Sequence, residues 1–317
     1  MVTEPTAPIA ARTAIVTVSY GSTALLRTNL VPLRRQTPVE VVVVDNFSST
    51  GERDSITTLC REEGWRLVAN DSNVGFGAGV NAGVQVALDA GANRLVILNP
   101  DATIDADSLG RLVAAASEPG VVAAPTVLRP DGSVWSQGSD LYLADGRIRS
   151  IRRRLPVPSI ERVTWLSGAC LALSDATWNA VGGFVTDYFL YWEDVDLSYR
   201  AQRSGLLLEL VEDAVVVHAE GGTQQAGLSR SGQAKSGTYY RYNIRNRLLF
   251  GAKYLDVQHW RSWLRHTPAV SWEILLQGGR WQFLHRPQVL LSAARGLLEG
   301  LKLARHERRQ RQKVSSG

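Results

Sequence analysis

Short apolar runs alternate with amphipathic stretches over the first hundred residues of the chain. The apolar runs are rich in β-branched residues, as in TAIVTVS (13–19) and VEVVVVDN (39–46), which is typical of strands buried on both faces. The stretches between them place apolar residues at helical spacing. The predicted strands are residues 13–19, 39–46, 65–70 and 94–102, and the predicted helices are 22–35, 52–63 and the part of 73–92 that follows a glycine-rich turn.

This alternation predicts an α/β fold, in which a mostly parallel central sheet carries helices on both faces. Ligands of such sheets bind at the carboxyl ends of the strands. Polar residues lie at these predicted strand ends, and they are Ser19, Asp45, Asn46, Asn99 and Asp101. The sequence therefore predicts a ligand site at this edge of the sheet.

The pattern becomes less regular after residue 105. An arginine-rich segment, DGRIRSIRRRLPVP (145–158), lies between turn residues and is predicted to be a loop. Strand character returns at 162–173 and again at 206–218, where the run ends at His218.

An acidic stretch, FLYWEDVDLSYRA (189–201), lies between these two strands. It leads into a helix that we expect to end near Ser204, because Gly205 is a helix stop signal. Acids in the first turn of a helix are favourable through the helix dipole alone. That explanation accounts for one carboxylate better than for three beside Tyr191 and Trp192. A carboxylate at a pocket edge can instead act as a general base toward a hydroxyl.

From residue 237 onward the pattern is helical and the composition is basic. In the last predicted helix, six apolar residues share one face at i, i+3/i+4, i+7 spacing, and they are Leu290, Leu291, Ala294, Leu297, Leu298 and Leu301. Such a basic amphipathic helix either packs on its own domain or lies in a membrane interface. The sequence leaves both interpretations open.

Charge is distributed unevenly along the 317 residues. The net charge is +5, yet residues 237–317 contain 15 Lys and Arg against 4 Asp and Glu, which leaves the preceding part at −6. A basic tail on an acidic body suggests an anionic surface or ligand near the C-terminal region. A solvated helix face is the simpler alternative.

The two cysteines, Cys60 and Cys170, match neither a disulfide framework nor a metal-type spacing. Residues 1–12 contain prolines and an acid but no apolar core, so we interpret them as a loose leader rather than a signal peptide. No apolar run approaches the roughly 18 residues of a membrane span. We expect a cytoplasmic protein that is soluble or peripheral on the inner face of the plasma membrane.

Two residues at strand ends are candidate metal ligands. Asp101 follows Asn-Pro at the end of the fourth strand, and hard divalent cations prefer such oxygen ligands. His218 ends the run AVVVH, and imidazole combined with carboxylate suits Mn²⁺. Taken singly, Asp101 is also typical of a turn and His218 of a structural histidine.

The glycine-rich segment NVGFGAGVNAG (73–83) contains Gly77, Gly79 and Ala82 at the spacing of a dinucleotide-binding fingerprint. That fingerprint belongs to the first strand–helix turn of its fold, whereas two such units precede it here. The glycines therefore support a dinucleotide-dependent oxidoreductase only weakly. A tight turn with close helix–strand packing explains them equally well. A non-catalytic carbohydrate-binding or scaffold protein is a further alternative.

An ordered set of motifs gives the sequence its most specific resemblance. The segments VDNFSS, NVGFGAGVN, LNPDA, WLSGACLAL, FLYWEDVDLSYR, VVVHAEGGT and YYRYNIRNRLL follow one another between residues 13 and 250. This series resembles the inverting family 2 glycosyltransferases, especially the rhamnosyltransferase-like branch of bacterial surface-polysaccharide assembly. The resemblance implies a GT-A nucleotide-sugar-binding fold.

The resemblance also implies roles for individual residues. Asp194 matches the catalytic base, and Glu193 would orient the neighbouring backbone or the acceptor. Asp101 and His218 would bind the metal; the family's usual Asp-x-Asp motif has Asn99 at its first position here. The remaining donor-binding residues would be Ser19, Tyr20, Asp45, Asn46, Asn73, Gly75, Asn81 and Asn99, and the sugar and acceptor side would contain Trp165, Gly168, Ala169 and Trp192. Asp196 would cap the helix or pair with an arginine such as Arg200.

The implied reaction is metal-dependent, inverting transfer of a sugar to a hydroxyl of a lipid-linked or polysaccharide acceptor, with Mg²⁺ or Mn²⁺ as cofactor. The branch favours dTDP-L-rhamnose as donor, and a UDP-hexose or UDP-galactofuranose is the alternative. We expect a catalytic domain over 13–236, divided near 105/106, and a basic helical region over 237–317. An anionic membrane surface and a second copy of the chain are the expected macromolecular partners, and no motif indicates nucleic acid.

Overall fold

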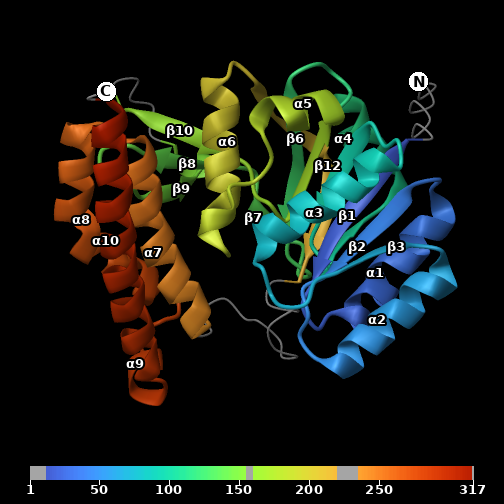
Figure 1. Cartoon of the computed structure of the whole chain (residues 1–317), viewed down its shortest axis with the longest axis horizontal. Helices are drawn as coiled ribbons and strands as arrows, with labels where there is room; N and C mark the ends of the chain where they lie inside the picture. Colours follow the sequence, from blue (N-terminus) through green and yellow to red (C-terminus); the bar gives the residue numbers. More distant parts are fainter. Residues whose placement is uncertain (1–11, 155–159, 220–234, 316–317) are drawn as a thin grey trace.

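The computed structural model describes residues 12–154, 160–219 and 235–315 (Figure 1). The predicted leader lies outside the described residues except for Arg12, so its interpretation stays a prediction.

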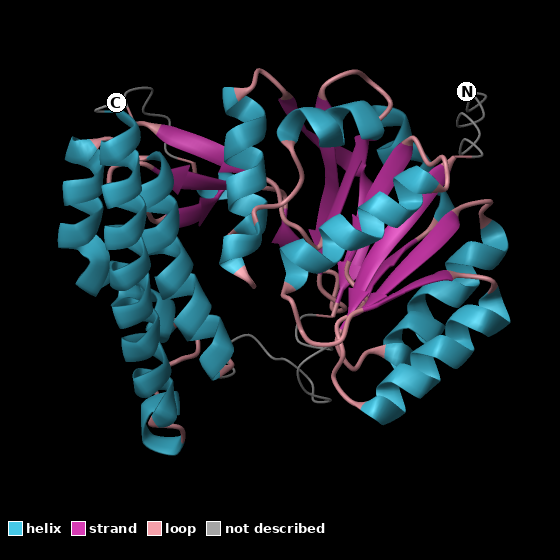
Figure 2. Ribbon diagram, viewed as in Figure 1, coloured by secondary structure: helices cyan, strands magenta, loops and turns pink. Residues whose placement is uncertain are grey.

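A nine-stranded sheet runs through the molecule in the order β3-β2-β1-β4-β11-β6-β12-β5, and β7 pairs with β6 (Figure 2). The strands β1, β2, β3 and β4 are parallel, as predicted, whereas β11 is antiparallel to both β4 and β6. The prediction of an α/β fold with a mostly parallel central sheet is confirmed. The strands of this sheet are β1 (Thr13–Ser19), β2 (Glu40–Asp45), β3 (Arg66–Ala69), β4 (Arg94–Leu98), β5 (Ala102–Ile104), β6 (Val121–Leu128), β7 (Val134–Ser136), β11 (Cys170–Ser174) and β12 (Leu207–His218).

Helices cover both faces of this sheet, and capping residues fix several of their ends. Ser49 accepts a hydrogen bond from the Glu52 N–H and begins α2, and Gly64 ends that helix in the left-handed conformation. Asp105 caps α4 through the Ser108 N–H. The helices are α1 (Thr23–Gln36), α2 (Thr50–Glu63), α3 (Phe76–Asp89), α4 (Ala106–Ala115), α5 (Asp175–Val181) and α6 (Glu193–Arg203).

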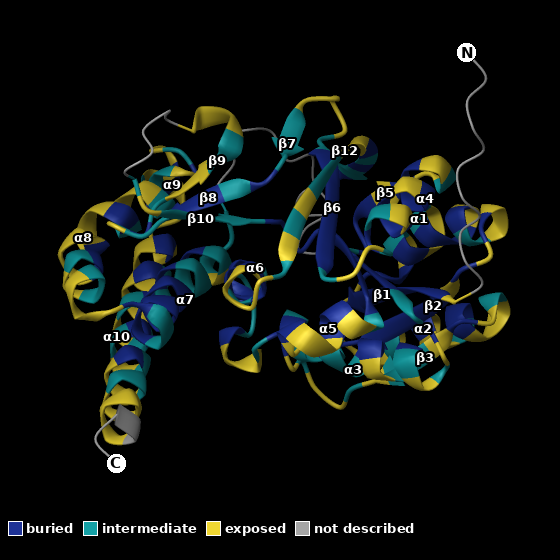
Figure 3. Cartoon of the chain, turned by 90° about the horizontal axis from the view of Figure 1, so that it is seen from above, coloured by how far each residue is buried: buried dark blue, intermediate teal, exposed yellow. Residues whose placement is uncertain are grey.

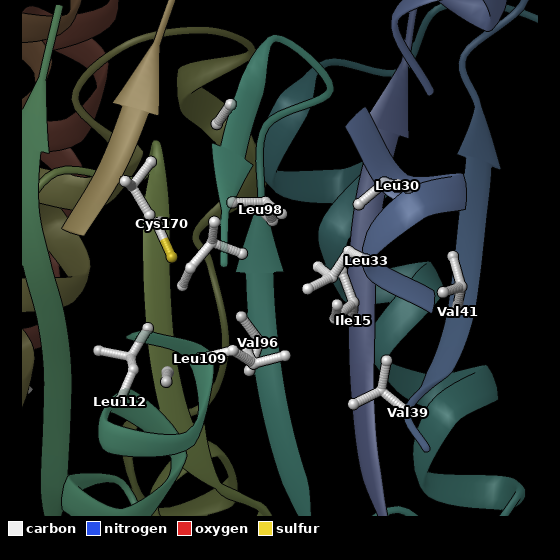
Figure 4. Close-up of a cluster of buried hydrophobic side chains, with 14 of the residues drawn as sticks. Ile15, Leu30, Leu33, Val39, Val41, Val96, Leu98, Leu109, Leu112 and Cys170 are labelled. Atoms are coloured by element: carbon white, nitrogen blue, oxygen red, sulfur yellow. The ribbon is translucent and has the colours of Figure 1, made fainter. Parts of the chain in front are cut away.

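Successive residues of the strands feed two separate cores because strand side chains alternate between faces. Ile15 and Val43 pack with α1, α2 and α4 on one face, and Figure 4 shows part of this cluster. Val16 and Val42 pack with α3, α5 and α6 on the other face. Viewed from above, β1 and β6 are dark blue, whereas β7 is teal and β12 is largely teal and yellow (Figure 3). Burial on both faces explains why the strands are almost entirely apolar.

A second, three-stranded sheet joins the central sheet to the C-terminal helices. Its strands are β8 (Ser139–Tyr142), β9 (Ile148–Ser150) and β10 (Arg162–Trp165), in the order β10-β8-β9. The C-terminal helices are α7 (Gly237–Tyr254), α8 (Val257–Leu276), α9 (Gln282–His285) and α10 (Gln288–Ser315). One apolar cluster contains Leu141 of β8, Trp192, Tyr199 of α6, and Phe250 and Trp263 of α7 and α8. Because this core crosses the predicted boundary at 236/237, we propose that the helices fold together with the catalytic part.

The arginine-rich segment is more regular than predicted. Residues 148–150 form β9 and pair with β8, so the prediction of a loop is wrong there. Arg147 forms an ion pair with Glu273 of α8 at 2.6 Å, and Arg154 forms one with Asp140 at 2.8 Å. These contacts tie the segment to its surroundings up to residue 154, and residues 155–158 lie outside the described part.

No helix in the described part of the chain is long and apolar enough to cross a bilayer.

Candidate active site

The predicted polar edge forms where β1, β2 and β4 end. Ser19 is buried, and its Oγ accepts a hydrogen bond from the Ser22 N–H at 3.2 Å, which shapes the turn into α1. Tyr20 follows with 48% of its surface exposed, so its ring is free to face a ligand. Asp45 is buried at the end of β2, where it pairs with Arg53 of α2 and accepts from the Phe47 N–H at 3.0 Å. The edge is therefore organised by side chains that bond to nearby backbone and to one arginine.

A second group of polar contacts fixes the glycine-rich turn against this edge. Asn46 donates to the Gly75 carbonyl at 2.9 Å, and Asn73 accepts from the Gly75 N–H at 2.9 Å. Gly75 has φ of +90°, and a Cβ there would lie 2.4 Å from the Phe189 carbonyl oxygen. Only glycine tolerates both conditions. The turn consequently approaches the segment that precedes the acidic helix.

The two predicted metal ligands meet at the end of the sheet. His218 pairs with Ala102 in the antiparallel contact between β12 and β5, and the Ala219 N–H donates to the Asp101 carbonyl at 3.0 Å. As a result, the His218 Nε2 lies 3.0 Å from the Asp101 Oδ1, and both side chains are buried. The His218 Nδ1 has no hydrogen-bond partner among the described residues. The pairing of strands far apart in sequence thus creates a carboxylate–imidazole pair.

The segment before α6 has an unusual backbone. Phe189, Tyr191 and Trp192 have φ values of 62°, 66° and 77°, in the left-handed region that non-glycine residues rarely adopt. Each such residue costs on the order of 1–3 kcal/mol and persists only where the surroundings hold it. The Phe76 N–H holds one side of the segment by donating to the Phe189 carbonyl at 2.7 Å.

Asn246 of α7 holds the other side of this segment. Its side-chain amide is buried and donates to the carbonyls of Tyr188, Leu190 and Tyr191 at 2.8, 2.9 and 2.7 Å. The motif YYRYNIRNRLL contains Asn246, but the sequence alone predicted no role for this residue. The usable signal was a polar residue among buried apolar positions of a helix, because a buried amide must find partners.

Two hydrogen bonds to backbone groups connect Asp194 to the Asn99–Asp101 motif. Its Oδ2 accepts a hydrogen bond from the Gly168 N–H at 2.9 Å, and its Oδ1 accepts from the Val195 N–H at 2.8 Å. The next residue, Ala169, accepts at its carbonyl from the Asn99 N–H at 3.0 Å. Gly168 and Ala169 directly precede β11, which pairs with β4, so this turn lies opposite Asn99. The acidic helix and the Asn99–Asp101 motif therefore border the same edge.

Comparison with known proteins now decides the family. The sequence model of the protein family described as "Glycosyl transferase family 2" matches residues 14–169. An N-acetylglucosaminyl-diphospho-decaprenol L-rhamnosyltransferase of Mycobacterium tuberculosis is 31% identical over 231 residues, which are 64% of this chain and 75% of that relative. This chain belongs to glycosyltransferase family 2.

Two further proteins resemble this glycosyltransferase. The dTDP-rhamnosyl transferase RfbF of Shigella flexneri is 24% identical over 187 residues, covering 57% of this chain and 60% of the relative. Among solved structures, the mannosyltransferase PcManGT from Pyrobaculum calidifontis, in complex with GDP-Man and Mn²⁺, has a TM-score of 0.48 and 18% identity, covering 96% of this chain and 81% of that one.

Burial changes the acidity of two neighbouring carboxyl groups in the glycosyltransferase. It raises the pKa of Asp194 to about 6, although hydrogen bonds from backbone N–H groups favour the charged form. Burial, and then the charge of Asp194, raise the pKa of Glu193 to about 8. The Glu193 Oε2 is buried and has no partner among the described residues. At neutral pH the pair therefore combines an ionised Asp194 with a protonated Glu193.

The third acid of the stretch is structural. Asp196 is fully buried and accepts hydrogen bonds from the hydroxyls of Tyr188 and Tyr254 at 2.8 and 2.7 Å. It also pairs with Arg200 at 2.5 Å, which confirms the expected arginine partner. The Asp196 carboxylate thereby fixes α6 to its neighbours and leaves Asp194 as the acid facing the edge.

Two predicted site residues lie elsewhere. The ring of Trp192 is buried against Phe250 and Trp263 in the aromatic core, so we leave it out of the proposed site. Asn81 exchanges hydrogen bonds with the N–H and carbonyl of Phe184 at 2.9 and 2.8 Å. Its amide thus serves the packing of α3, and we leave it out of the proposed site.

Trp165 stays a candidate for the acceptor side. It ends β10, is half-buried and lies two residues before Ser167, whose hydroxyl accepts from the Ala169 N–H at 3.3 Å. A Cβ at Gly168 would lie 3.4 Å from the Asp194 Cβ, an ordinary van der Waals contact, so this backbone is close to the acidic helix.

Proposed function

We propose that this glycosyltransferase moves L-rhamnose from dTDP-L-rhamnose to a hydroxyl of a lipid-linked or polysaccharide acceptor, with inversion at the anomeric carbon. The names of the two rhamnosyltransferase relatives support the sugar, and one of them also supports a polyprenyl-diphosphate-linked acceptor. The single observation that carries the chemistry is the backbone connection from Asp194 through Gly168 and Ala169 to Asn99.

Asp194 is the proposed general base. Its partly buried carboxylate, oriented by the N–H groups of Gly168 and Val195, takes the proton of the acceptor hydroxyl. The hydroxyl oxygen then bonds to C1 of the donor sugar while the bond from C1 to the diphosphate oxygen breaks on the opposite face. This single displacement inverts the anomeric configuration. A pKa near 6 keeps Asp194 ionised at neutral pH and leaves it more basic than an exposed aspartate.

Asp101 and His218 are the proposed residues for Mg²⁺ or Mn²⁺. The donor set of one carboxylate and one imidazole suits such an ion. In the described part of the chain no cluster of three or more His, Cys, Asp or Glu side chains is placed to hold a metal, so the donor diphosphate would complete the ligand set. When bound, the cation would neutralise negative charge on the departing nucleoside diphosphate.

The remaining donor contacts follow from position on the edge. Tyr20 offers an exposed ring beside the end of β1, and Asp45 with Arg53 borders the end of β2. We propose that they contact the base and ribose. Asn73, Gly75 and Asn46 shape the adjacent turn, and Asn99 contributes through its position before Asp101.

A panel of nucleotide sugars tests this proposal. The full chain, with Mn²⁺ or Mg²⁺ and a synthetic N-acetylglucosaminyl-diphospho-polyprenol, is supplied with dTDP-L-rhamnose, UDP-glucose or UDP-galactofuranose. We expect nucleoside-diphosphate release and product of inverted configuration with dTDP-L-rhamnose, and loss of both with EDTA. Preferential turnover of a UDP-sugar would replace rhamnose by a hexose, and turnover without metal would remove the assigned roles of Asp101 and His218.

A further inference from the structure

The C-terminal helices leave an apolar surface open to water. Five large apolar residues contribute to it, and they are Trp281, Leu284, Leu290, Leu291 and Leu298, with exposed fractions of 75%, 73%, 43%, 71% and 69%. We call this surface the α9–α10 patch. Figure 1 shows α9 at the lower end of the C-terminal helices. Several large apolar residues exposed on two successive helices are a candidate interaction site.

The patch is open because α10 packs through a different face. That face contains Ala293, Gly296, Gly300 and Ala304, and a Cβ on Gly296 would lie 2.2 Å from the carbonyl oxygen of Arg241 in α7. Small residues let the two helix backbones approach closely. Leu290, Leu291 and Leu298 of the leucine-rich face therefore stay exposed, whereas Leu297 packs against the cluster that contains Tyr240 and Ile244 of α7.

The charge around the patch is positive. The segment from Ile274 to Leu298 contains Arg280, Arg286 and Arg295 and no acidic residue. Farther along α10, exposed cations continue on the open side at Lys302, Arg305 and Arg309.

The two acids of α10 are directed to the packed side. Glu299 forms an ion pair with Arg241 of α7 at 2.8 Å. Glu307 lies 3.7 Å from Lys253, which also belongs to α7. The open side of the helix thereby combines leucines with uncompensated positive charge. A second copy of this chain would bring like charges together at such a surface, which disfavours self-association.

We propose that the α9–α10 patch docks the protein on an anionic lipid bilayer. Leu284, Leu291 and Leu298 would enter the boundary between headgroups and acyl chains, and Trp281 would lie at headgroup level, where indole rings are favoured. The surrounding arginines and lysine would contact lipid phosphates. The docking does not rest on the proposed reaction, although it would bring the catalytic edge close to a lipid-linked acceptor.

Vesicle flotation of the full chain tests the proposal. Wild type is mixed with vesicles of phosphatidylcholine containing phosphatidylglycerol, or of phosphatidylcholine alone. We expect strong partition to the anionic vesicles, weaker partition at high salt, and little to the neutral ones. The triple variant Trp281→Ser, Leu284→Gln and Leu291→Gln should lose about tenfold or more in partition coefficient, since two leucines no longer insert and the indole ring at headgroup level is removed.

A matched control separates the patch from exposed apolar residues in general. Leu207, at the start of β12, is 64% exposed and lies outside the helical layer, so Leu207→Gln should bind vesicles like wild type. Near-ultraviolet circular dichroism and the thermal midpoint of the triple variant should match those of wild type. Unchanged vesicle binding by the folded triple variant would overturn the proposal. The proposal would also be overturned if the wild type bound no vesicles and formed a dimer that the triple substitution converts to a monomer.

Discussion

The proposed catalytic edge, where β1, β2 and β4 end, and the α9–α10 patch are built in opposite ways. At the edge, polar side chains such as Asn46 and Asp194 are held by backbone groups from distant parts of the chain. At the patch, apolar side chains project from a helix that packs through its small residues. The difference fits the two proposals: side chains fixed by hydrogen bonds for the proposed chemistry, and exposed apolar side chains for the proposed docking.

The largest effect should come from the acid at the edge. Asp194→Asn keeps the size of the side chain but removes the base, so kcat should fall about a thousandfold while the Kd for dTDP stays near that of wild type. Steady-state kinetics and calorimetry measure the two quantities. Asp187→Asn is the matched control, since Asp187 is an exposed acid that pairs with Lys253 just before the same segment. Near-normal turnover of Asp194→Asn would remove Asp194 as the base.

Next in size is the residue that holds the segment before α6. Asn246→Leu leaves three carbonyls without their donor and should release the left-handed backbone at Tyr191. We expect kcat to fall roughly a hundredfold with a smaller change in the donor KM, because misplacement of a catalytic group mainly affects turnover. Asn243→Leu, one turn earlier in α7, should be close to neutral. If both variants lose activity equally, a general effect of α7 packing explains the result and the positioning role of Asn246 is wrong.

The pH profile should show the raised pKa of Asp194. Because burial raises this pKa to about 6, kcat should decline as pH falls below about 6, and by about tenfold at pH 5. An exposed aspartate would stay active to about pH 4. Rate measurements from pH 4.5 to 8 on stably folded protein distinguish the two. A flat profile down to pH 5 would contradict the buried environment of the base.

The two faces of α10 offer a test by stability. Gly296→Leu places a side chain against the Arg241 carbonyl and should cost about 1–3 kcal/mol of unfolding free energy, as overpacking does. Ala294→Leu adds three carbons on the open face, one fewer than Gly296→Leu adds on the packed face, and should change stability by less than about 0.5 kcal/mol. Urea unfolding of both variants measures the difference. Equal destabilisation would mean that both faces are packed in solution.

The smallest effect concerns Glu193 and the stability of the fold. Its pKa is raised from 4.5 to about 8, so the native state favours the protonated form. The stability that this group contributes is fully present below about pH 4.5 and is lost as pH rises toward 8. Glu193→Gln, which resembles the protonated side chain, should therefore show a flatter dependence of unfolding free energy on pH between 5 and 8. An unchanged slope would argue against burial of the charge.

The sequence predicted the strands and helices of residues 13–105 well because the signals there are local. Each β/α unit carries its own apolar run and helix period, and β1 was predicted with its observed bounds, Thr13–Ser19. Tertiary contacts decided the rest. The sequence could not show that Trp192 turns into the aromatic core, since that depends on φ of +77° and on Phe250 from α7. It likewise identified the leucine face of α10 without showing that Gly296 and Gly300 would draw the opposite side onto α7.

The proposed reaction depends on Asp101, His218 and Asp194 bordering the same edge of the sheet. A crystal structure of the full chain with dTDP and Mn²⁺ tests it most directly. We expect the diphosphate to lie between the Asp101–His218 pair and the turn at Gly168 and Ala169. The Asp194 carboxylate should face the side of the terminal phosphate to which the sugar would be bonded. A nucleotide bound elsewhere, or an Asp194 carboxylate directed away from that phosphate, would contradict the account.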